Sequence, residues 1–418
     1  MRRITRRELL IGLGSAAAVG IGRAVAWADS RWQEGPREQG QASVARPPNR
    51  WAIEASYYGS FWAKGTLDCS ACHGTLDDPR QVSYCHTPHT GSYVQCALCP
   101  HRCIIADGDR GRCRVREHRR GRLYSLVYGN PAAVNVDPIE KKPFYHFLPG
   151  ASAFSIGTAG CNLRCLYCQN WSLSQVPPEE TQATDLPPEG VVSSARQSSA
   201  PVIAFTYSEP TVFYEYVLAT ARLAREAGLR SVVVSAGFIN PEPLRELCGA
   251  VDAIKVDLKG FSDAFYRKVC SAELAPVLRA IETIQEMGVH LEIVNLVVPT
   301  LNDDLEQLRM LSRWVARTLS PDVPLHFSRF YAQYRLLNLP PTPVETLERA
   351  RQAALDEGLR YVYLGNVPGH AADNTYCPTC GQPVILRQGF SVLEYHLDAG
   401  NCAYCGRPIP GVWWPSTH

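Results

Sequence analysis

The sequence predicts an α/β protein built on a partial TIM-type (βα) barrel, with a cysteine-rich region before the barrel and a zinc-ribbon or rubredoxin-like knuckle after it. Two observations predict this architecture. From residue 153 onward, short β-branched runs alternate with amphipathic stretches, and strands that alternate with helices form a parallel sheet. Most of the 16 cysteines lie in close clusters, which indicates metal ligation more than a disulfide framework.

The bulk composition narrows the class of protein. The 418 residues are 45% hydrophobic, enough to bury a full core, and the formal net charge of +2 gives no support for a nucleic-acid partner. We expect a targeting segment at residues 1–28, a linker at 29–50, a cysteine-rich metal-binding region at 51–130, the barrel at 131–370 and the knuckle module at 371–418.

The first 28 residues have the pattern of an export signal. Arg6 and Arg7 precede a weakly apolar run at residues 9–22, and Ala26-Trp27-Ala28 offers a small-x-small cleavage site. The pair of arginines resembles a twin-arginine signal, which would carry a folded chain with its cofactors across the membrane. An uncleaved membrane anchor, a basic tail and a cytoplasmic location are the alternatives.

Two cysteine clusters precede the barrel. In the second, Cys96, Cys99, Cys103 and Cys113 can close around one zinc ion or one 4Fe–4S cluster. In the first, Cys69, Cys72 and His73 match the pattern for covalent attachment of haem c. We favour zinc, held by Cys69, Cys72, Cys85 and either His86 or His89, or another role without haem, because haem attachment fits poorly with a chain that is exported already folded.

The barrel elements follow from the periodicity. Strands are expected at residues 153–158, 201–207, 230–236, 253–258, 290–298 and 324–330, with a further candidate at 361–365, and helices between them include 211–228, 276–288 and 303–319. In the first of these helices Val212, Tyr216 and Leu223 recur at helical spacing before Gly228. Functional sites in such folds lie at the carboxyl ends of the strands.

Three cysteines directly follow the first strand. Cys161, Cys165 and Cys168 are spaced C-x3-C-x2-C. Zinc sites and ordinary iron–sulfur clusters take four protein ligands, so three thiolates leave one metal position open. A zinc site that takes a fourth ligand from elsewhere in the chain is the alternative.

This spacing after the first barrel strand resembles the radical S-adenosylmethionine (SAM) superfamily. The segments "DPIEKKPFYHFLPG", "SIGTAGCNLRCLYCQNWSLSQ", "AFTYSEPTVFYEY" and "DAIKVDLKGFSDAFYRKVC" resemble the AmmeMemoRadiSam system radical SAM enzymes, relatives of the pyruvate formate-lyase activating enzymes. The resemblance runs from about Cys96 to Trp413. It implies that the three thiolates hold a 4Fe–4S cluster, that SAM binds the open iron, and that reductive cleavage of SAM yields a 5′-deoxyadenosyl radical that abstracts hydrogen.

The resemblance also implies cofactor-binding residues. Tyr167 is the aromatic residue expected near the adenine, and Glu209 of "TYSEP" suits the methionyl ammonium, with Thr206 and Ser208 beside it. Further residues expected around the cofactor, each near the end of a strand, are Ser235, Asp257, Lys259, Asn295, His326 and Arg329. A surface ion pair is the alternative for Asp257 and Lys259, and a structural histidine is the alternative for His326.

The last fifty residues carry a second kind of metal site. Cys377 and Cys380, then Cys402 and Cys405, form two C-x2-C pairs, each followed by a glycine. The pattern resembles a zinc-ribbon or rubredoxin knuckle. Zinc would make it a structural clip and iron an electron relay, and both metals accept four thiolates.

The predicted function is therefore that of a radical SAM enzyme, with an activase-like action on a protein as one candidate reaction. Its expected partners are a low-potential electron donor, a protein or small-molecule substrate and, from the family resemblance, Memo-like and AMMECR-type proteins. The alternative is a non-catalytic, exported electron-transfer protein that uses haem c or rubredoxin-type iron.

Overall fold

The computed structural model describes residues 52–64 and 90–414. The predicted signal at residues 1–28, the linker at 29–50 and the cluster with Cys69, Cys72 and His73 lie outside the described residues. Among those described, no helix combines the length and the apolar character needed to span a membrane.

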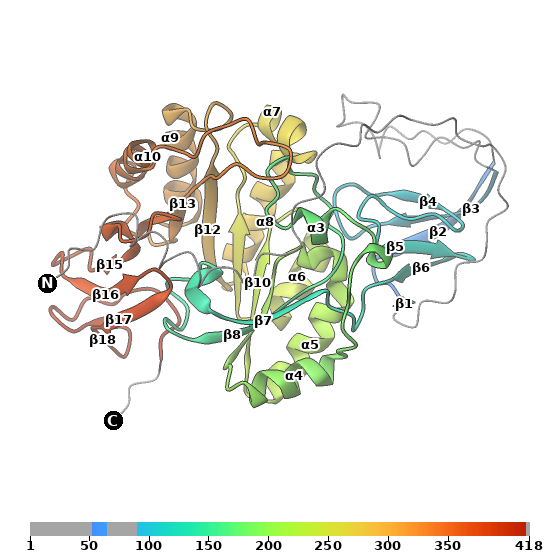
Figure 1. Cartoon of the computed structure of the whole chain (residues 1–418), viewed down its shortest axis with the longest axis horizontal. Helices are drawn as coiled ribbons and strands as arrows, with labels where there is room; N and C mark the ends of the chain where they lie inside the picture. Colours follow the sequence, from blue (N-terminus) through green and yellow to red (C-terminus); the bar gives the residue numbers. More distant parts are fainter. Residues whose placement is uncertain (1–51, 65–89, 415–418) are drawn as a thin grey trace, which may run out of the picture. The chain divides into compact units, whose positions relative to one another are not determined.

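An eight-stranded sheet forms the centre of the molecule (Figure 1), in the order β14-β13-β12-β11-β10-β9-β8-β7. Its strands are β7 (Ala133–Pro138), β8 (Ser152–Gly157), β9 (Val202–Phe205), β10 (Arg230–Ser235), β11 (Ala253–Asp257), β12 (His290–Val297), β13 (Leu325–Arg329) and β14 (Val362–Gly365). Strands β8 to β14 are parallel, and β7 pairs with β8 in the antiparallel direction. The predicted partial barrel is confirmed, and the candidate strand at 361–365 is its last strand.

Helices connect the parallel strands. They are α4 (Pro188–Gln197), α5 (Tyr214–Glu226), α6 (Pro241–Ala250), α8 (Leu274–Glu286), α9 (Leu305–Trp314) and α10 (Val344–Asp356), with the short α3 (Trp171–Ser174) and α7 (Asp263–Phe265). The predicted helix at 211–228 begins as a 3-10 turn, η4 (Pro210–Phe213), and the one at 303–319 ends as a π-helical turn, η6 (Val315–Leu319). Shorter turns are η2 (Ile139–Lys141), η3 (Pro178–Glu180), the π turn η5 (Tyr266–Cys270) and η7 (Ala371–Asp373).

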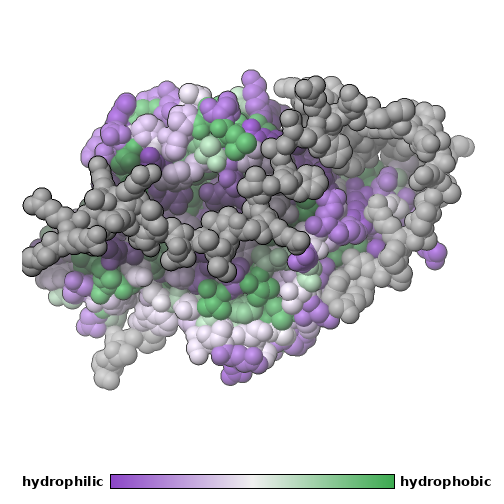
Figure 2. All heavy atoms as spheres, in the orientation of Figure 1, coloured by the Kyte–Doolittle hydropathy of each residue, from purple (hydrophilic) through white to green (hydrophobic). Residues whose placement is uncertain are grey.

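The core forms because the central strands are apolar on both faces. Every residue of β9 is buried, as are most residues of β10 and β11. Strands of parallel sheets have this composition because helices cover one face and the barrel interior covers the other. On the face drawn in Figure 2, hydrophilic and hydrophobic residues are mixed over the described part of the chain.

Two small antiparallel sheets precede the barrel. One contains β1 (Ile53–Glu54), β6 (Arg122–Ser125) and β5 (Arg116–Arg119), and the other contains β2 (Tyr58–Lys64), β3 (Thr90–Cys96) and β4 (Ile104–Ala106). A buried ion pair ties this region to the barrel, because the guanidinium of Arg116 donates to both carboxylate oxygens of Glu215 on α5, at 3.1 and 2.9 Å. A two-point pair of this kind fixes orientation as well as distance.

A small β module follows the barrel. Its strands are β15 (Thr375–Tyr376), β16 (Pro383–Gln388), β17 (Ser391–Tyr395), β18 (Leu397–Asp398) and β19 (Asn401–Cys402). Arg387 on β16 is buried and donates to the carbonyl of Tyr145 at 2.8 Å, and Val412 donates to the carbonyl of His146 at 2.8 Å. The module therefore packs against the segment between β7 and β8.

A buried carboxylate also stabilises the segment between β7 and β8. Glu292 on β12 accepts hydrogen bonds from the backbone amides of Tyr145 and His146 and lies 2.8 Å from Nε2 of His326. Burial opposes ionisation, but the partners His290 and His326 hold the pKa of Glu292 well below its usual value. Glu292 is thus a buried charged group that is paired with two histidines and two backbone amides.

The interface with the C-terminal module predicts a pH effect on stability. Burial raises the pKa of Asp373 from 3.8 to about 6. A carboxyl group with a raised folded-state pKa stabilises the protein at acid pH, and this contribution is lost as the pH rises from about 4 to about 6. We expect Asp373→Asn to gain stability relative to the wild type between about pH 4 and pH 8, by at most about 3 kcal/mol.

Thermal unfolding at the two pH values measures this gain. Asp356→Asn, at an exposed position at the end of α10, is the matched control and should show no such gain. If the difference in stability between Asp373→Asn and the wild type stayed constant with pH, this result would contradict the raised pKa of Asp373.

Candidate active site

A cavity of about 440 Å³ opens at the carboxyl edge of the parallel sheet. The residues that follow the strand ends line it, among them Cys161, Cys165, Cys168, Thr206, Glu209, Ser235, Asp257, Lys259, Ser328 and Gly365. The location is the one at which sites occur in (βα) folds. Of the thirteen residues predicted around the triad and its cofactor, ten line this one cavity: the three cysteines, Tyr167, Thr206, Ser208, Glu209, Ser235, Asp257 and Lys259.

The three cysteines between β8 and α3, called the triad below, occupy a loop that is fixed by backbone hydrogen bonds. Arg164 donates from its amide to the carbonyl of Cys270 at 2.9 Å, and the side chain of Asn162 donates to the carbonyl of Phe238 at 2.8 Å. The triad residues Cys161 and Cys168 are partly exposed, and Cys165 is buried. The loop therefore holds three thiols around one space without using any of them in a disulfide.

Ionisation of the triad thiols to free thiolates is unfavourable. Burial, the carboxylate of Glu209 and the other triad thiols raise the pKa of Cys161 well above its usual value. A hydrogen bond with the thiol of Cys270 and burial do the same for Cys165. A bound metal cluster offsets this cost, because metal coordination keeps a thiol deprotonated.

Glu209 is held rigidly at the wall of the cavity. One carboxylate oxygen, Oε1, accepts from the hydroxyls of Thr211 and Ser235, both at 2.7 Å. The other, Oε2, accepts from the amide of Ala236 at 2.8 Å. Only 2% of Glu209 is exposed, so the carboxylate is desolvated and preorganised for a cationic group.

The ends of β8 and β9 approach each other closely beside Glu209. A side chain at Gly157 would place its Cβ 2.5 Å from the carbonyl oxygen of Thr206, so only glycine fits there. Tyr207 adopts a positive φ of 66° in the same turn. The hydroxyl of Ser208 is buried and has no hydrogen-bond partner among the described residues, which leaves a donor and acceptor for a bound molecule.

Three charged residues on one face of β11 and the loop after it form a second polar wall. Asp257 lies between Lys255 and Lys259, and its Oδ2 is 2.9 Å from Nζ of Lys259. Burial opposes ionisation, but the two lysines lower the pKa of Asp257 to about 2. The ion pair of Asp257 and Lys259 lies in the cavity and not on an open surface, and the lysines together exceed the carboxylate by one positive charge.

Three predicted cofactor residues do not line the cavity. The amide of Asn295 donates to the carbonyl of Leu258 at 2.7 Å, and His326 is paired with Glu292. Arg329 donates to the carbonyl of Thr342 at 2.7 Å and lies over the ring of Tyr331. The contacts of His326 match its structural alternative.

Several lining residues were not predicted. Tyr207 donates to Asp137 at 2.5 Å, and Lys142, which pairs with Asp137 at 2.6 Å, lies over the ring of Tyr207. Lys255 could have been found, because alternation along the strand places it on the face of Asp257. Phe390, between β16 and β17, also lines the cavity, although nothing in its sequence surroundings indicates this.

The four C-terminal cysteines, called the C-terminal set below, come together at one point. Their sulfur atoms all lie within 4.8 Å of one another, with Cys377 and Cys405 at 3.6 Å and Cys380 and Cys402 at 3.7 Å. A tetrahedral metal with thiolate bonds of about 2.3 Å requires sulfur separations of about 3.8 Å. The C-terminal set therefore has the geometry of a single-ion site. The other predicted set, Cys96, Cys99, Cys103 and Cys113, lines a separate cavity.

The residues of the large cavity fit an iron–sulfur cluster with SAM. Three thiols face one space, a desolvated carboxylate suits an ammonium group, and a surplus lysine charge suits a carboxylate. The unpartnered hydroxyl of Ser208 adds a polar contact. Fold and site together define an enzyme of the class that uses a three-cysteine 4Fe–4S cluster with SAM.

Comparison with known proteins agrees with this class, and the chain belongs to the radical SAM superfamily. The superfamily profile matches residues 155–311. Uncharacterized protein MJ0808 of Methanocaldococcus jannaschii is 45% identical over 318 residues, which cover 76% of this chain and 95% of that protein.

More distant relatives include activating enzymes. The pyruvate formate-lyase-activating enzyme of Clostridium pasteurianum is 22% identical over 215 residues, which cover 48% of this chain and 87% of that enzyme. Among solved structures, SuiB of Streptococcus suis aligns with a TM-score of 0.41 and 11% identity, covering 55% of this chain and 52% of that one.

The close approach at Gly157 gives a testable prediction. We expect Gly157→Ala to destabilise the fold by about 1–3 kcal/mol, because the new Cβ displaces the turn at Thr206 and Tyr207. The same displacement should weaken SAM binding. Denaturant unfolding and SAM titration measure the two effects.

Gly249→Ala is the matched control. Gly249 lies in α6, its added Cβ would meet nothing within 4 Å, and alanine there should stabilise the helix by up to about 1 kcal/mol. If Gly157→Ala and Gly249→Ala were equally stable, the close contact between residue 157 and the carbonyl of Thr206 would not be important for stability.

Proposed function

We propose that the chain cleaves SAM reductively and uses the resulting organic radical to abstract hydrogen from a substrate. The observation that supports this is the convergence of the triad, Glu209 and Lys259 on one cavity. When bound, the cluster and SAM supply a one-electron cleavage of a carbon–sulfur bond. The protein itself supplies position, charge and protection from water.

Individual residues have distinct tasks in this proposal. Glu209, fixed by Ser235 and Ala236, binds the ammonium group of SAM, and Lys259 binds its carboxylate while Asp257 fixes the lysine. Tyr167 is buried, lines the cavity and stacks loosely on Phe265, with ring centroids 6.4 Å apart. It contributes an aromatic wall for the adenine.

The surroundings of the cavity favour a polypeptide substrate, as the kinship with activating enzymes suggests. Large side chains are exposed beside lining residues: Trp171 follows Asn170, the hydroxyl of Tyr331 lies 3.3 Å from the carbonyl of Asn366, and Phe390 is itself part of the wall. Exposed aromatic groups at a cavity mouth are typical of surfaces that bind proteins. A low-potential one-electron donor is the second partner that the reaction requires.

The triad is the first target for a test. Replacing Cys165 by Ala leaves two thiolates, so the reduced protein should lose the SAM-dependent shift of its electron paramagnetic resonance signal and should form 5′-deoxyadenosine only at the background level. Cys248→Ala, at a buried cysteine on α6 outside all four cysteine clusters, is the control and should retain both. Formation of 5′-deoxyadenosine by Cys165→Ala with dithionite would exclude the proposed function.

We further propose that the C-terminal set binds one zinc ion as a structural clip. Burial opposes ionisation, but backbone hydrogen bonds from Cys380 and Thr379 lower the pKa of Cys377 to about 7, which favours metal binding at neutral pH. The sulfur separations described above support a single ion.

Loss of one ligand should release this metal and loosen the module. We expect Cys405→Ser to lose about one metal ion per chain and to become sensitive to proteolysis beyond residue 374, while the barrel unfolds at nearly the wild-type temperature. Metal analysis and limited proteolysis of the full chain measure this, with Cys248→Ala as control. Unchanged metal content in Cys405→Ser would refute the site, and iron in place of zinc would make it a rubredoxin-type centre.

A further inference from the structure

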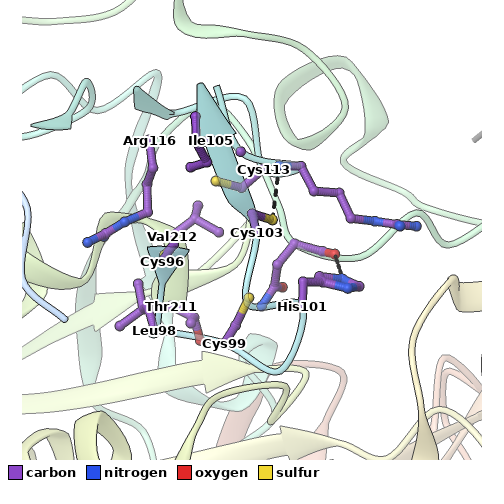
Figure 3. A pocket seen from close by; sticks show the side chains of 13 residues that line it. Cys96, Leu98, Cys99, His101, Cys103, Ile105, Cys113, Arg116, Thr211 and Val212 are labelled. Carbon is purple, nitrogen blue, oxygen red and sulfur yellow. Dashed lines mark hydrogen bonds between the residues drawn. The ribbon is translucent and has the colours of Figure 1, made fainter. Parts of the chain in front are cut away.

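A second, smaller cavity lies between the small β2-β3-β4 sheet and the barrel (Figure 3), and four thiols line it. The four, called the N-terminal set below, are Cys96, Cys99, Cys103 and Cys113. Cys96 ends β3, and Cys99 and Cys103 lie in the tight connection to β4. Cys113 comes from the loop before β5. None of them forms a disulfide.

The backbone around the N-terminal set is arranged for metal-bound sulfur. The amide of Arg112 donates to Sγ of Cys103 at 3.5 Å, as in the hydrogen bonds to sulfur that tune iron–sulfur clusters. The amide of Cys96 donates to the carbonyl of Cys103 at 2.9 Å, and Arg102 adopts a positive φ of 43°. A Cβ at Gly111 would contact the side chains of Cys103 and Ile105. The absence of a side chain at Gly111 therefore leaves space beside the sulfur atom of Cys103.

The thiols of the N-terminal set are spaced more widely than those of the C-terminal set. In the C-terminal set all four sulfur atoms lie within 4.8 Å of one another, and no three thiols or imidazole nitrogens of the second cavity come that close. One zinc ion would require separations of about 3.8 Å. In a 4Fe–4S cluster each thiolate binds a different iron atom, so the sulfur atoms stand farther apart around a larger core.

The wall of this cavity also carries an uncompensated cation. Arg112 lines the cavity next to Cys113, and the cationic group that contacts it is the guanidinium of Arg164, which donates to the carbonyl of Arg112. Nε of Arg112 is buried without a hydrogen-bond partner, and no carboxylate of the described residues pairs with it. A buried cation of this kind is stabilised by a neighbouring anionic group.

The second cavity shares a wall with the triad loop. His101 lies 2.8 Å from the carbonyl of Asn162, which directly follows Cys161 and itself lines the second cavity. A Cβ at Gly160 would lie 2.6 Å from the carbonyl of Cys113, so the two loops touch through their backbones. Arg164 donates to the carbonyl of Cys161 at 3.0 Å and also to the carbonyl of Arg112.

We propose that the N-terminal set binds a second 4Fe–4S cluster, which passes single electrons to the cluster of the triad. A low-potential one-electron carrier, of the reduced flavin or ferredoxin type, reduces the second cluster by one electron. Transfer through the shared wall then reoxidises the second cluster and reduces the cluster of the triad by one electron, and no bond or proton changes. The site itself does not depend on the proposed function, whereas the electron transfer does.

The site can be tested in a full-length chain without the triad. The variant Cys161→Ala/Cys165→Ala/Cys168→Ala, reconstituted anaerobically with iron and sulfide, should hold about four sulfides and at least about four irons per chain. Its reduced signal should not respond to SAM. Adding Cys99→Ala and Cys103→Ala should abolish the sulfide, whereas adding Cys248→Ala should not.

Sulfide is the deciding measurement, because a single iron or zinc ion in either four-cysteine set contributes none. Retention of the metal of the C-terminal set and an unchanged circular dichroism spectrum show that the five-cysteine variant is folded. Absence of sulfide from the triad-free chain, or two zinc ions per chain with no iron, would overturn the second cluster even if the wild type cleaves SAM.

Electron exchange requires the two clusters to be close, and this has its own readout. The electron paramagnetic resonance spectrum of the fully reduced wild type should be broader than the sum of the spectra of the triad-free chain and of Cys99→Ala/Cys103→Ala. A spectrum equal to that sum would show two independent clusters and would overturn the transfer step.

Discussion

The parallel register of β8 to β14 is the constraint on which the candidate active site depends. Because all seven strands run in the same direction, their carboxyl ends meet at one edge, and short loops deliver the triad, Glu209 and Lys259 to a common space. The register in turn requires a close approach of β8 and β9, which Gly157 permits. A chain with the same side chains on an antiparallel sheet would scatter them between two edges.

Charge compensation is the second condition that the structure satisfies. Buried ionic groups are costly unless they are paired, and several of the described charges in or near the cavity are paired. Asp137 pairs with Lys142, Asp257 with two lysines, and Glu292 with two histidines and two backbone amides. These networks fix the orientation of groups that would otherwise have several rotamers, which is the preorganisation that a binding site needs.

The sequence predicts the strands and the triad well, because both depend on local information. Runs of β-branched residues indicate strands that are buried on both faces, and the spacing of cysteines indicates metal ligation in any surrounding fold. The sequence does not determine which polar residues near the strand ends line the cavity. Asn295 and Ser235 are both polar residues near strand ends, yet only Ser235 lines the cavity. Asn295 lies between Val294 and Leu296, which line the cavity, so its own side chain is on the opposite face of β12, where it donates to the carbonyl of Leu258. Both faces of these strands are largely apolar, so the sequence does not indicate which face is turned to the cavity. The direction of Arg329 and the position of Phe390 depend on contacts between distant segments, and local periodicity carries no information about those.

Phe390 makes the C-terminal module, which also carries the C-terminal set of cysteines, part of the wall of the active-site cavity. The residue lies at the tip of the β16–β17 hairpin, far along the chain from every other residue of the cavity wall except Asn366 and Gly365. Its hairpin pairs with β15 and none of the barrel strands pairs with it, so lengthening or shortening the tip does not disturb the parallel register. A change of length or sequence at this tip would therefore alter the wall of the cavity without moving the strand ends that carry the triad, Glu209 and Lys259.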